Sequence, residues 1–144
     1  MKKGIQTRHQ INAPIESVWS HIATGAQWEN WLPILSGSKV SGNTRTCNLF
    51  GPDGHEDVLQ ESFLASNLEK TFIYQINQQQ SFPATDIVGY MKLEGDEKAT
   101  TLHWSVEMSV KSEEDFANIQ TQISFIYTEA AKQLEALAAD KLLA

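Results

Sequence analysis

Cysteine, long hydrophobic runs and excess positive charge are scarce in this sequence, and each scarcity excludes a class of protein. Cys47 is the only cysteine in 144 residues, so an intrachain disulfide is impossible, and one free thiol is typical of a reducing compartment such as the cytoplasm. No stretch reaches the ~18 apolar residues of a membrane-spanning helix, so we expect no membrane insertion. The 11 lysines and arginines against 18 aspartates and glutamates give a formal net charge of −7, which disfavours nucleic acid as a partner.

The sequence also lacks the spaced motifs that hold a metal, a nucleotide or a catalytic nucleophile. The four histidines share no metal-ligand spacing; they are His9, His21, His55 and His103. We find no Gly-x-Ser-x-Gly elbow and no glycine-rich phosphate loop. We therefore expect neither a metal nor a cofactor, and we expect each histidine to be solvated rather than catalytic.

The length fits one domain, residues 1–144, whose core needs no disulfide or metal. Loose alternation over residues 5–11 predicts a first strand. Asn12 is then expected to cap a helix that ends at Gly25. The apolar face of that helix comprises Ile15, Val18, Trp19 and Ile22. A second short helix or turn containing Trp28 and Trp31 should follow and end before Pro33.

Turn clusters at short intervals predict an antiparallel meander between residues 35 and 110. We place its strands near 35–41, 44–50, 55–64, 70–77, 85–94 and 99–110. The last strand is the clearest, because its apolar and polar residues alternate and so predict one buried and one wet face.

A long helix should close the fold, beginning after a capping serine, Ser112, and an acidic first turn. Its inward stripe would comprise Phe116, Ile119, Ile123, Ile126, Tyr127, Ala130, Leu134 and Leu137. The alanine-rich end, residues 136–144, is expected to pack little and to fray.

Several short motifs occur in an order typical of one superfamily. Residues 11–19, Ile-Asn-Ala-Pro-Ile-Glu-Ser-Val-Trp, and the later Trp31-Leu32-Pro33, Gly42-Asn43-Thr44-Arg45 and Gln60-Glu61-Ser62-Phe63 carry the resemblance. With them the chain resembles the polyketide cyclase/dehydrase-like branch of the START/Bet v 1-like (SRPBCC) superfamily. That resemblance implies an α+β helix-grip fold, in which a curved antiparallel sheet wraps around a long C-terminal helix. It also implies a cavity between the two, which the superfamily uses for lipids, hormones, aromatic metabolites and polyketide intermediates.

Arg45 and Glu61 are the most informative charged residues. Alternation with the apolar residues on either side turns both side chains inward, on two strands expected to be neighbours. A buried charge needs a partner, so we expect the two to pair. The pair would serve either as a polar anchor for a ligand or as a structural ion pair that sets sheet register.

Aromatic and flexible apolar residues could wall the cavity, although each is also a suitable core residue. Besides Arg45 and Glu61, the predicted ligand-binding residues are Trp28, Trp31, Tyr74, Tyr90, Met91, Trp104, Met108, Ile123 and Tyr127. Trp28 and Trp31 are expected near the cavity mouth. Cys47 is expected to be a small buried residue and not a nucleophile.

Three functions follow as hypotheses. The first is binding of a hydrophobic or aromatic small molecule by a cytoplasmic monomer or homodimer. The second is a cyclase/dehydrase (aromatase)-like enzyme in which Arg45, Glu61 or Tyr74 assists proton transfer. The third is a protein-interaction module that docks a partner through residues 28–33 and the acidic surface, with exposed tryptophans and a residual cavity.

Overall fold

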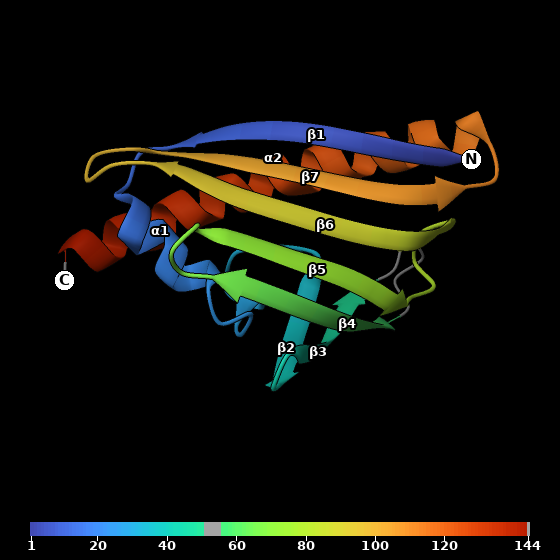
Figure 1. Cartoon of the computed structure of the whole chain (residues 1–144), viewed down its shortest axis with the longest axis horizontal. Helices are drawn as coiled ribbons and strands as arrows, with labels where there is room; N and C mark the ends of the chain where they lie inside the picture. The colour runs from blue at the N-terminus through green and yellow to red at the C-terminus, as the bar shows by residue number, and fades with distance from the viewer. Residues whose placement is uncertain (51–55, 144) are drawn as a thin grey trace.

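In the computed structural model, which describes residues 1–50 and 56–143, a single seven-stranded sheet curves around one long helix (Figure 1). The strands are β1 (Lys2–Ile11), β2 (Leu35–Ser41), β3 (Thr44–Phe50), β4 (Glu56–Ser66), β5 (Thr71–Gln78), β6 (Ala84–Gly95) and β7 (Thr100–Val110). The helices are α1 (Ile15–Ile22), a 3-10 turn η1 (Trp28–Asn30) and α2 (Glu113–Leu143). This is the predicted helix-grip fold.

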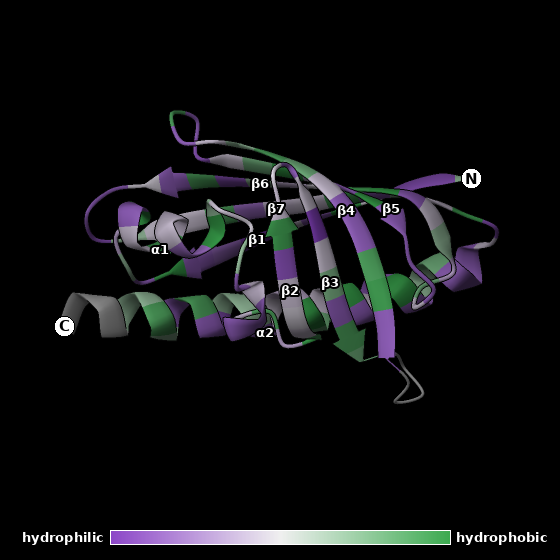
Figure 2. Cartoon of the chain, turned by 90° about the horizontal axis from the view of Figure 1, so that it is seen from below, coloured by the Kyte–Doolittle hydropathy of each residue, from purple (hydrophilic) through white to green (hydrophobic). Residues whose placement is uncertain are grey.

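The strands follow the order β1-β7-β6-β5-β4-β3-β2, and each neighbouring pair is antiparallel. The meander β2 to β7 therefore joins consecutive strands, while β1 pairs with the distant β7. Viewed from below, α2 lies along the open face of the sheet, and β2 and β3 run across its direction (Figure 2). The core lies between this helix and the inner face of the sheet.

Alternating polarity accounts for which strand face is buried. Along β7 the residues Leu102, Trp104, Val106, Met108 and Val110 are all buried, as predicted. Along β3 the inward residues Arg45, Cys47 and Leu49 are likewise buried, while the residues between them are more exposed. A period of two is what a sheet with one covered face requires.

The predicted ends of several elements need correction. Asn12 does not cap α1, whose N-cap residue is Pro14; instead, the Asn12 backbone N–H donates to Glu135 Oε1 at 2.6 Å. The first strand begins at Lys2, because pairing with β7 extends it beyond its apolar pattern. Strand β4 continues to Ser66, through residues predicted to turn, since β5 pairs with it there.

The long helix begins as predicted, and part of its alanine-rich end is better packed than expected. Ser112 Oγ accepts the backbone N–H of Asp115 at 3.1 Å, which is an N-terminal capping bond. The expectation of a poorly packed end is wrong at Ala138, which is fully buried, and the helix continues to Leu143. Among the described residues, no helix is both long and apolar enough to cross a membrane.

Candidate ligand-binding cavity

A small apolar cavity of about 90 Å³ lies between the concave face of the sheet and α2. Strands β3 to β7, the η1 region and the middle of α2 all contribute to its wall. Most of the lining is aliphatic or aromatic, and the side chains in it that carry a polar atom are Trp28, Arg45, Cys47, Glu61, Tyr74, Trp104 and Tyr127. A mostly apolar wall with a few placed polar groups is typical of small-molecule sites.

The predicted pairing of Arg45 with Glu61 is present in the wall of this cavity. The two residues lie directly opposite each other on β3 and β4. Arg45 Nε donates to Glu61 Oε1 at 3.0 Å and Nη2 donates to Oε2 at 3.3 Å, which makes a two-point ion pair. Both residues are buried, with 2% and 4% of their surfaces exposed, so the charges neutralise each other away from water.

The backbone of Gly25 and the side chains of Trp28 and Cys47 also contact this ion pair. Arg45 Nη1 donates to the carbonyl oxygen of Gly25 at 3.0 Å, and its guanidinium carbon lies 4.0 Å from the centre of the Trp28 ring. Cys47 Sγ donates to Glu61 Oε1 at 3.1 Å. Burial, helped by the nearby Glu61 carboxylate, raises the pKa of the Cys47 thiol, so this sulfur remains protonated and unreactive at neutral pH.

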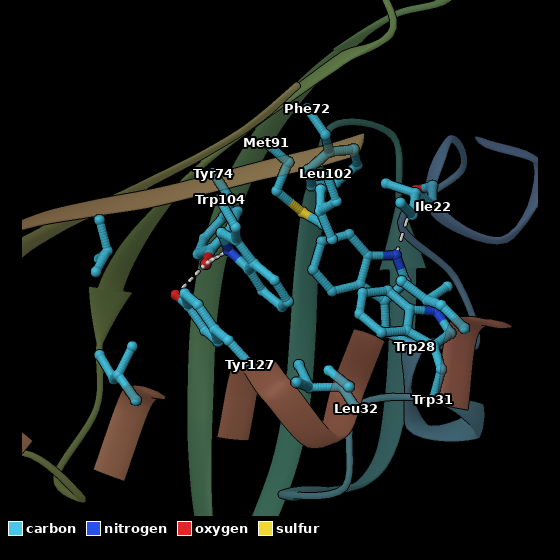
Figure 3. Packing of buried hydrophobic residues seen from close by; sticks show 14 of the residues in the cluster. Ile22, Trp28, Trp31, Leu32, Phe72, Tyr74, Met91, Leu102, Trp104 and Tyr127 are labelled. Carbon is cyan, nitrogen blue, oxygen red and sulfur yellow. Dashed lines mark hydrogen bonds between the residues drawn. The ribbon is translucent and has the colours of Figure 1, made fainter. Parts of the chain in front are cut away.

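A second polar cluster lies on another part of the wall and consists of Tyr74, Trp104 and Tyr127. Trp104 Nε1 donates to the Tyr74 hydroxyl oxygen at 3.0 Å, and the Tyr74 and Tyr127 hydroxyls lie 3.2 Å apart (Figure 3). The Trp104 and Tyr127 rings stack with centroids 3.6 Å apart. Burial raises the pKa of both tyrosines, so both are neutral phenols at physiological pH.

Gly89 positions the Tyr74 ring in this cluster. It lies opposite Tyr74 in the pairing of β5 with β6. A Cβ atom built on Gly89 would lie 2.0 Å from Cζ of the Tyr74 ring. The ring therefore lies across the glycine backbone, a position that any larger residue would block.

The structure brings most of the predicted ligand-binding residues to this cavity and excludes three of them. The cavity wall contains Trp28, Arg45, Glu61, Tyr74, Trp104, Met108, Ile123 and Tyr127. Trp31 and Met91 are buried in the core but do not line the cavity. Tyr90 is 38% exposed, on the outer face of β6, because adjacent strand residues point to opposite faces and Gly89 and Met91 face inward.

The burial of the tryptophans removes the observation that would have favoured the interaction-module hypothesis, which was their exposure. Trp28 and Trp31 are each 1% exposed, and their indole N–H groups donate to the carbonyl oxygens of Ile22 and His21. They pack together with ring centroids 4.7 Å apart. Trp28 lines the cavity, Trp31 packs against Trp28, and neither indole is exposed to a partner.

Sequence reasoning missed the boundary between the cavity and the surface. A hollow of about 250 Å³ adjoins the cavity, and the two share Ile34, Phe82 and Ile126. The hollow opens between the exposed rings of Phe50 and Phe125. Phe82, an isolated aromatic residue in an otherwise polar turn, was the available sequence signal for this boundary.

None of the described histidines, His9, His21 and His103, lines this wall. His9 is half-buried, and burial lowers its pKa; His103 lies 3.7 Å from Glu94 on the outer face. His55 falls outside the described residues. Within residues 1–50 and 56–143, no three acidic, histidine or cysteine side chains are grouped as a metal site would need.

Known structures share this architecture over almost the whole chain. The protein XoxI from Bacillus cereus is 25% identical, with a TM-score of 0.77 over 95% of this chain and 96% of that one. A START superfamily protein from Mycobacterium smegmatis is 13% identical, with a TM-score of 0.79 and coverage of 95% and 97%. The Zhui aromatase/cyclase from a Streptomyces species is 9% identical, with a TM-score of 0.83 and coverage of 99% and 96%. The last two show a common fold alone.

No curated protein matches the sequence. A family model, however, matches residues 3–140, which is nearly the entire domain. The family is described as polyketide cyclase/dehydrase and lipid transport. By its sequence and its fold, this chain therefore belongs to the polyketide cyclase/dehydrase and lipid transport family.

Proposed function

We propose that the protein binds a hydrophobic or aromatic small molecule in the cavity between the sheet and α2. One observation carries this proposal: an apolar cavity inside the domain is walled by aromatic rings and contains two separate polar groups. A domain that needed only a packed core would fill this space, because protein interiors are close-packed. Membership of a family that includes lipid transport proteins supports the same function.

Arg45 and Glu61 form one polar end of the proposed site. Because their charges cancel in a two-point pair, they favour a neutral polar group on the ligand over a lone carboxylate. The same pair also fixes the register of β3 against β4. An affinity measurement on Arg45 variants that remain folded separates a binding role from a purely structural one.

Ligand binding requires the cavity to enlarge. Its volume of about 90 Å³ is below the about 150 Å³ of an engineered cavity that holds benzene. The adjoining hollow supplies the additional space if the side chains of Ile34, Phe82 and Ile126 move apart. We therefore place the ligand entrance between the β5–β6 turn and α2.

A cavity-filling variant with a matched surface variant tests the proposal. The neutral dye N-phenylnaphthylamine should bind wild type with a blue-shifted emission. Ile123→Trp, which places a larger side chain in the cavity, should weaken this binding about tenfold or more. Ser124→Trp, at the exposed neighbouring position, should bind as wild type does. Circular dichroism establishes that both variants are folded.

Native mass spectrometry of the gently purified protein provides a test that requires no mutation. A small adduct that is lost on denaturation supports the proposal and identifies the chemical class of the ligand. An empty protein that also fails to bind the dye contradicts it, as does a folded Ile123→Trp protein with unchanged affinity.

A cyclase-like enzyme is the second candidate, and the proton-bearing groups in the cavity favour it. Glu61, Tyr74 and Tyr127 line the same space and would be the residues that assist proton transfer. This candidate predicts turnover of a polyketide-like chain that disappears in Glu61→Gln and Tyr74→Phe. Binding without turnover supports the first function alone.

The proposal includes a cytoplasmic protein, a monomer or a homodimer, that needs no cofactor. Cys47 is buried and protonated in the wall, which is the form that a reducing compartment maintains. Sedimentation of the purified protein, with and without the dye, measures the oligomeric state directly.

A further inference from the structure

The tyrosine cluster of the cavity contains one more hydrogen-bond donor than its own contacts consume. Trp104, Tyr74 and Tyr127 each carry one polar hydrogen. Two hydrogen bonds link the three groups: Trp104 to the Tyr74 oxygen at 3.0 Å, and the bond between the two hydroxyls at 3.2 Å. One phenolic O–H is therefore left over, whichever tyrosine donates to the other.

No other acceptor within the described part of the chain is bonded to either hydroxyl. Both tyrosines line the cavity, and Figure 3 shows their oxygen atoms directed toward each other between the sheet and α2. A buried polar hydrogen without a partner costs free energy, so a ligand oxygen placed here would recover it. An acceptor oxygen on a ligand would therefore complete the hydrogen bonding of the cluster.

The rigidity of the cluster supports this assignment. Tyr127 is held by stacking on Trp104 with an interplanar angle of 9°, and Tyr74 is held against Gly89, where a Cβ would clash. Each hydroxyl is thus fixed before a ligand arrives. Preorganised polar groups confer orientation and selectivity at little entropic cost.

The electrostatics of the wall restrict the charge of the ligand. Neutral phenols supply no positive charge, and the Arg45 charge is already cancelled by Glu61. The guanidinium carbon lies 6.0 Å from the Tyr74 ring centre, so the ion pair borders the same space. An anion brought into this environment would lose hydration without gaining a counter-charge.

We infer that Tyr74 and Tyr127 together present a single O–H donor to the ligand, and that they select a neutral apolar molecule carrying a carbonyl-type oxygen. This inference rests on the proposed function and specifies the ligand class for the same cavity. Ketones, esters and quinones fit the description, whereas hydrocarbons and free fatty acids do not.

Acetophenone and ethylbenzene test the inference, because they have similar shapes and only the former has an oxygen acceptor. Dissociation constants for both are measured by displacement of N-phenylnaphthylamine from wild type and from the double variant Tyr74→Phe/Tyr127→Phe. Loss of the hydroxyls should weaken acetophenone binding about fivefold while ethylbenzene binding stays the same. Tyr90→Phe, which removes a hydroxyl from the outer face, is the matched control and should change neither constant.

The two proposals fail in distinguishable ways. If wild type binds neither compound and does not bind the dye, the proposed function is wrong. If both compounds bind and the double variant weakens them equally, or weakens neither, the donor assignment is wrong and the binding function stands.

An NMR signal of the wild-type protein provides a second readout that is independent of the double variant's folding. Addition of acetophenone to wild type should shift the indole N–H resonance of Trp104, because this group donates to Tyr74. Ethylbenzene at equal occupancy should shift it less. Equal shifts for the two compounds would overturn the inference.

Discussion

The cavity contains two buried polar groups that differ in how completely they satisfy themselves. We call the Arg45–Glu61 pair closed because its charges cancel, each guanidinium nitrogen donates to an acceptor in Glu61 or Gly25, and the Trp28 ring covers the guanidinium. The tyrosine cluster is open, because its three donors share two hydrogen bonds. The comparison teaches that a buried charge with a complete partner differs from a neutral cluster with one spare donor. Under the inference above, the neutral cluster, and not the ion pair, is the group that selects the ligand.

The largest expected change in stability comes from removing one partner of the Arg45–Glu61 ion pair. Arg45→Met leaves the Glu61 carboxylate buried without its partner and should lower the free energy of unfolding by about 3–5 kcal/mol. Replacing both residues, as in Arg45→Met/Glu61→Leu, should recover most of that loss, since no unpaired charge remains. Urea unfolding measures both values. A single variant as stable as wild type would show that the pair is not closed.

A smaller loss is expected when the open group is displaced. Gly89→Ala forces the Tyr74 ring to move and should cost about 1–3 kcal/mol, as other overpacked positions do. It should also weaken the binding of acetophenone, which depends on the hydroxyls, more than the binding of ethylbenzene, which does not. Gly37→Ala is the matched control, because a Cβ there meets nothing within 4 Å. Equal stability of the two variants would contradict the proposed position of the ring.

The pH dependence of stability distinguishes the tyrosines from the ion pair. The folded state raises the pKa of Tyr74 and Tyr127, so their contribution is complete below the unfolded value of about 10 and is lost as pH rises above it. Each tyrosine should add a loss of about 1.4 kcal/mol per pH unit in that range. The Cys47 thiol adds a loss of the same sign, which begins at a lower pH.

Urea unfolding between pH 9 and 11 tests this dependence. Tyr127→Phe should flatten the alkaline slope relative to wild type, because one ionising group has been removed. A variant slope as steep as that of wild type would mean that Tyr127 is not shielded from water.

The smallest effect is expected outside the cavity. Tyr90→Phe changes a half-exposed side chain on the outer face and should alter the free energy of unfolding by less than about 0.5 kcal/mol. Ligand affinity should remain constant. A measurable loss of ligand affinity would contradict the proposed position of the ligand site on the inner face of the sheet.

The sequence predicted the closed group better than the open one, for a physical reason. Arg45 lies between inward-facing apolar residues, so the period of two gave its direction, and the need to neutralise a buried charge gave its partner. The hydroxyl cluster joins residues from β5, β7 and α2, and no local pattern specifies that these three meet. Each of the three could be predicted to lie in the cavity wall. The hydrogen bonds that join them, and the one donor that these bonds leave over, could not be predicted.

The incorrect predictions also have physical causes that can be traced to particular residues. Tyr90 and Met91 are both suitable wall residues by type, but neighbours on one strand cannot share a face, and Gly89 gives no hydropathy signal to decide between them. Asn12 is of a residue type that often caps helices. Its backbone N–H, however, donates to the carboxylate of Glu135, which lies 123 positions away in the chain. Long-range contacts of this kind override local preference and are not visible in a short window of sequence.

The pairing of β1 with β7 has a consequence for how the domain is made. Thr7 and Trp104 are joined by a hydrogen bond although they lie 97 positions apart, and similar separations recur along both strands. Contacts between such distant residues slow folding, because a long loop must close before they form. During synthesis β1 must wait for β7, and the apolar inner face of the sheet must wait for α2, which follows all seven strands. Until α2 is made, the wall of the cavity is therefore an uncovered apolar surface, which is a condition that favours aggregation.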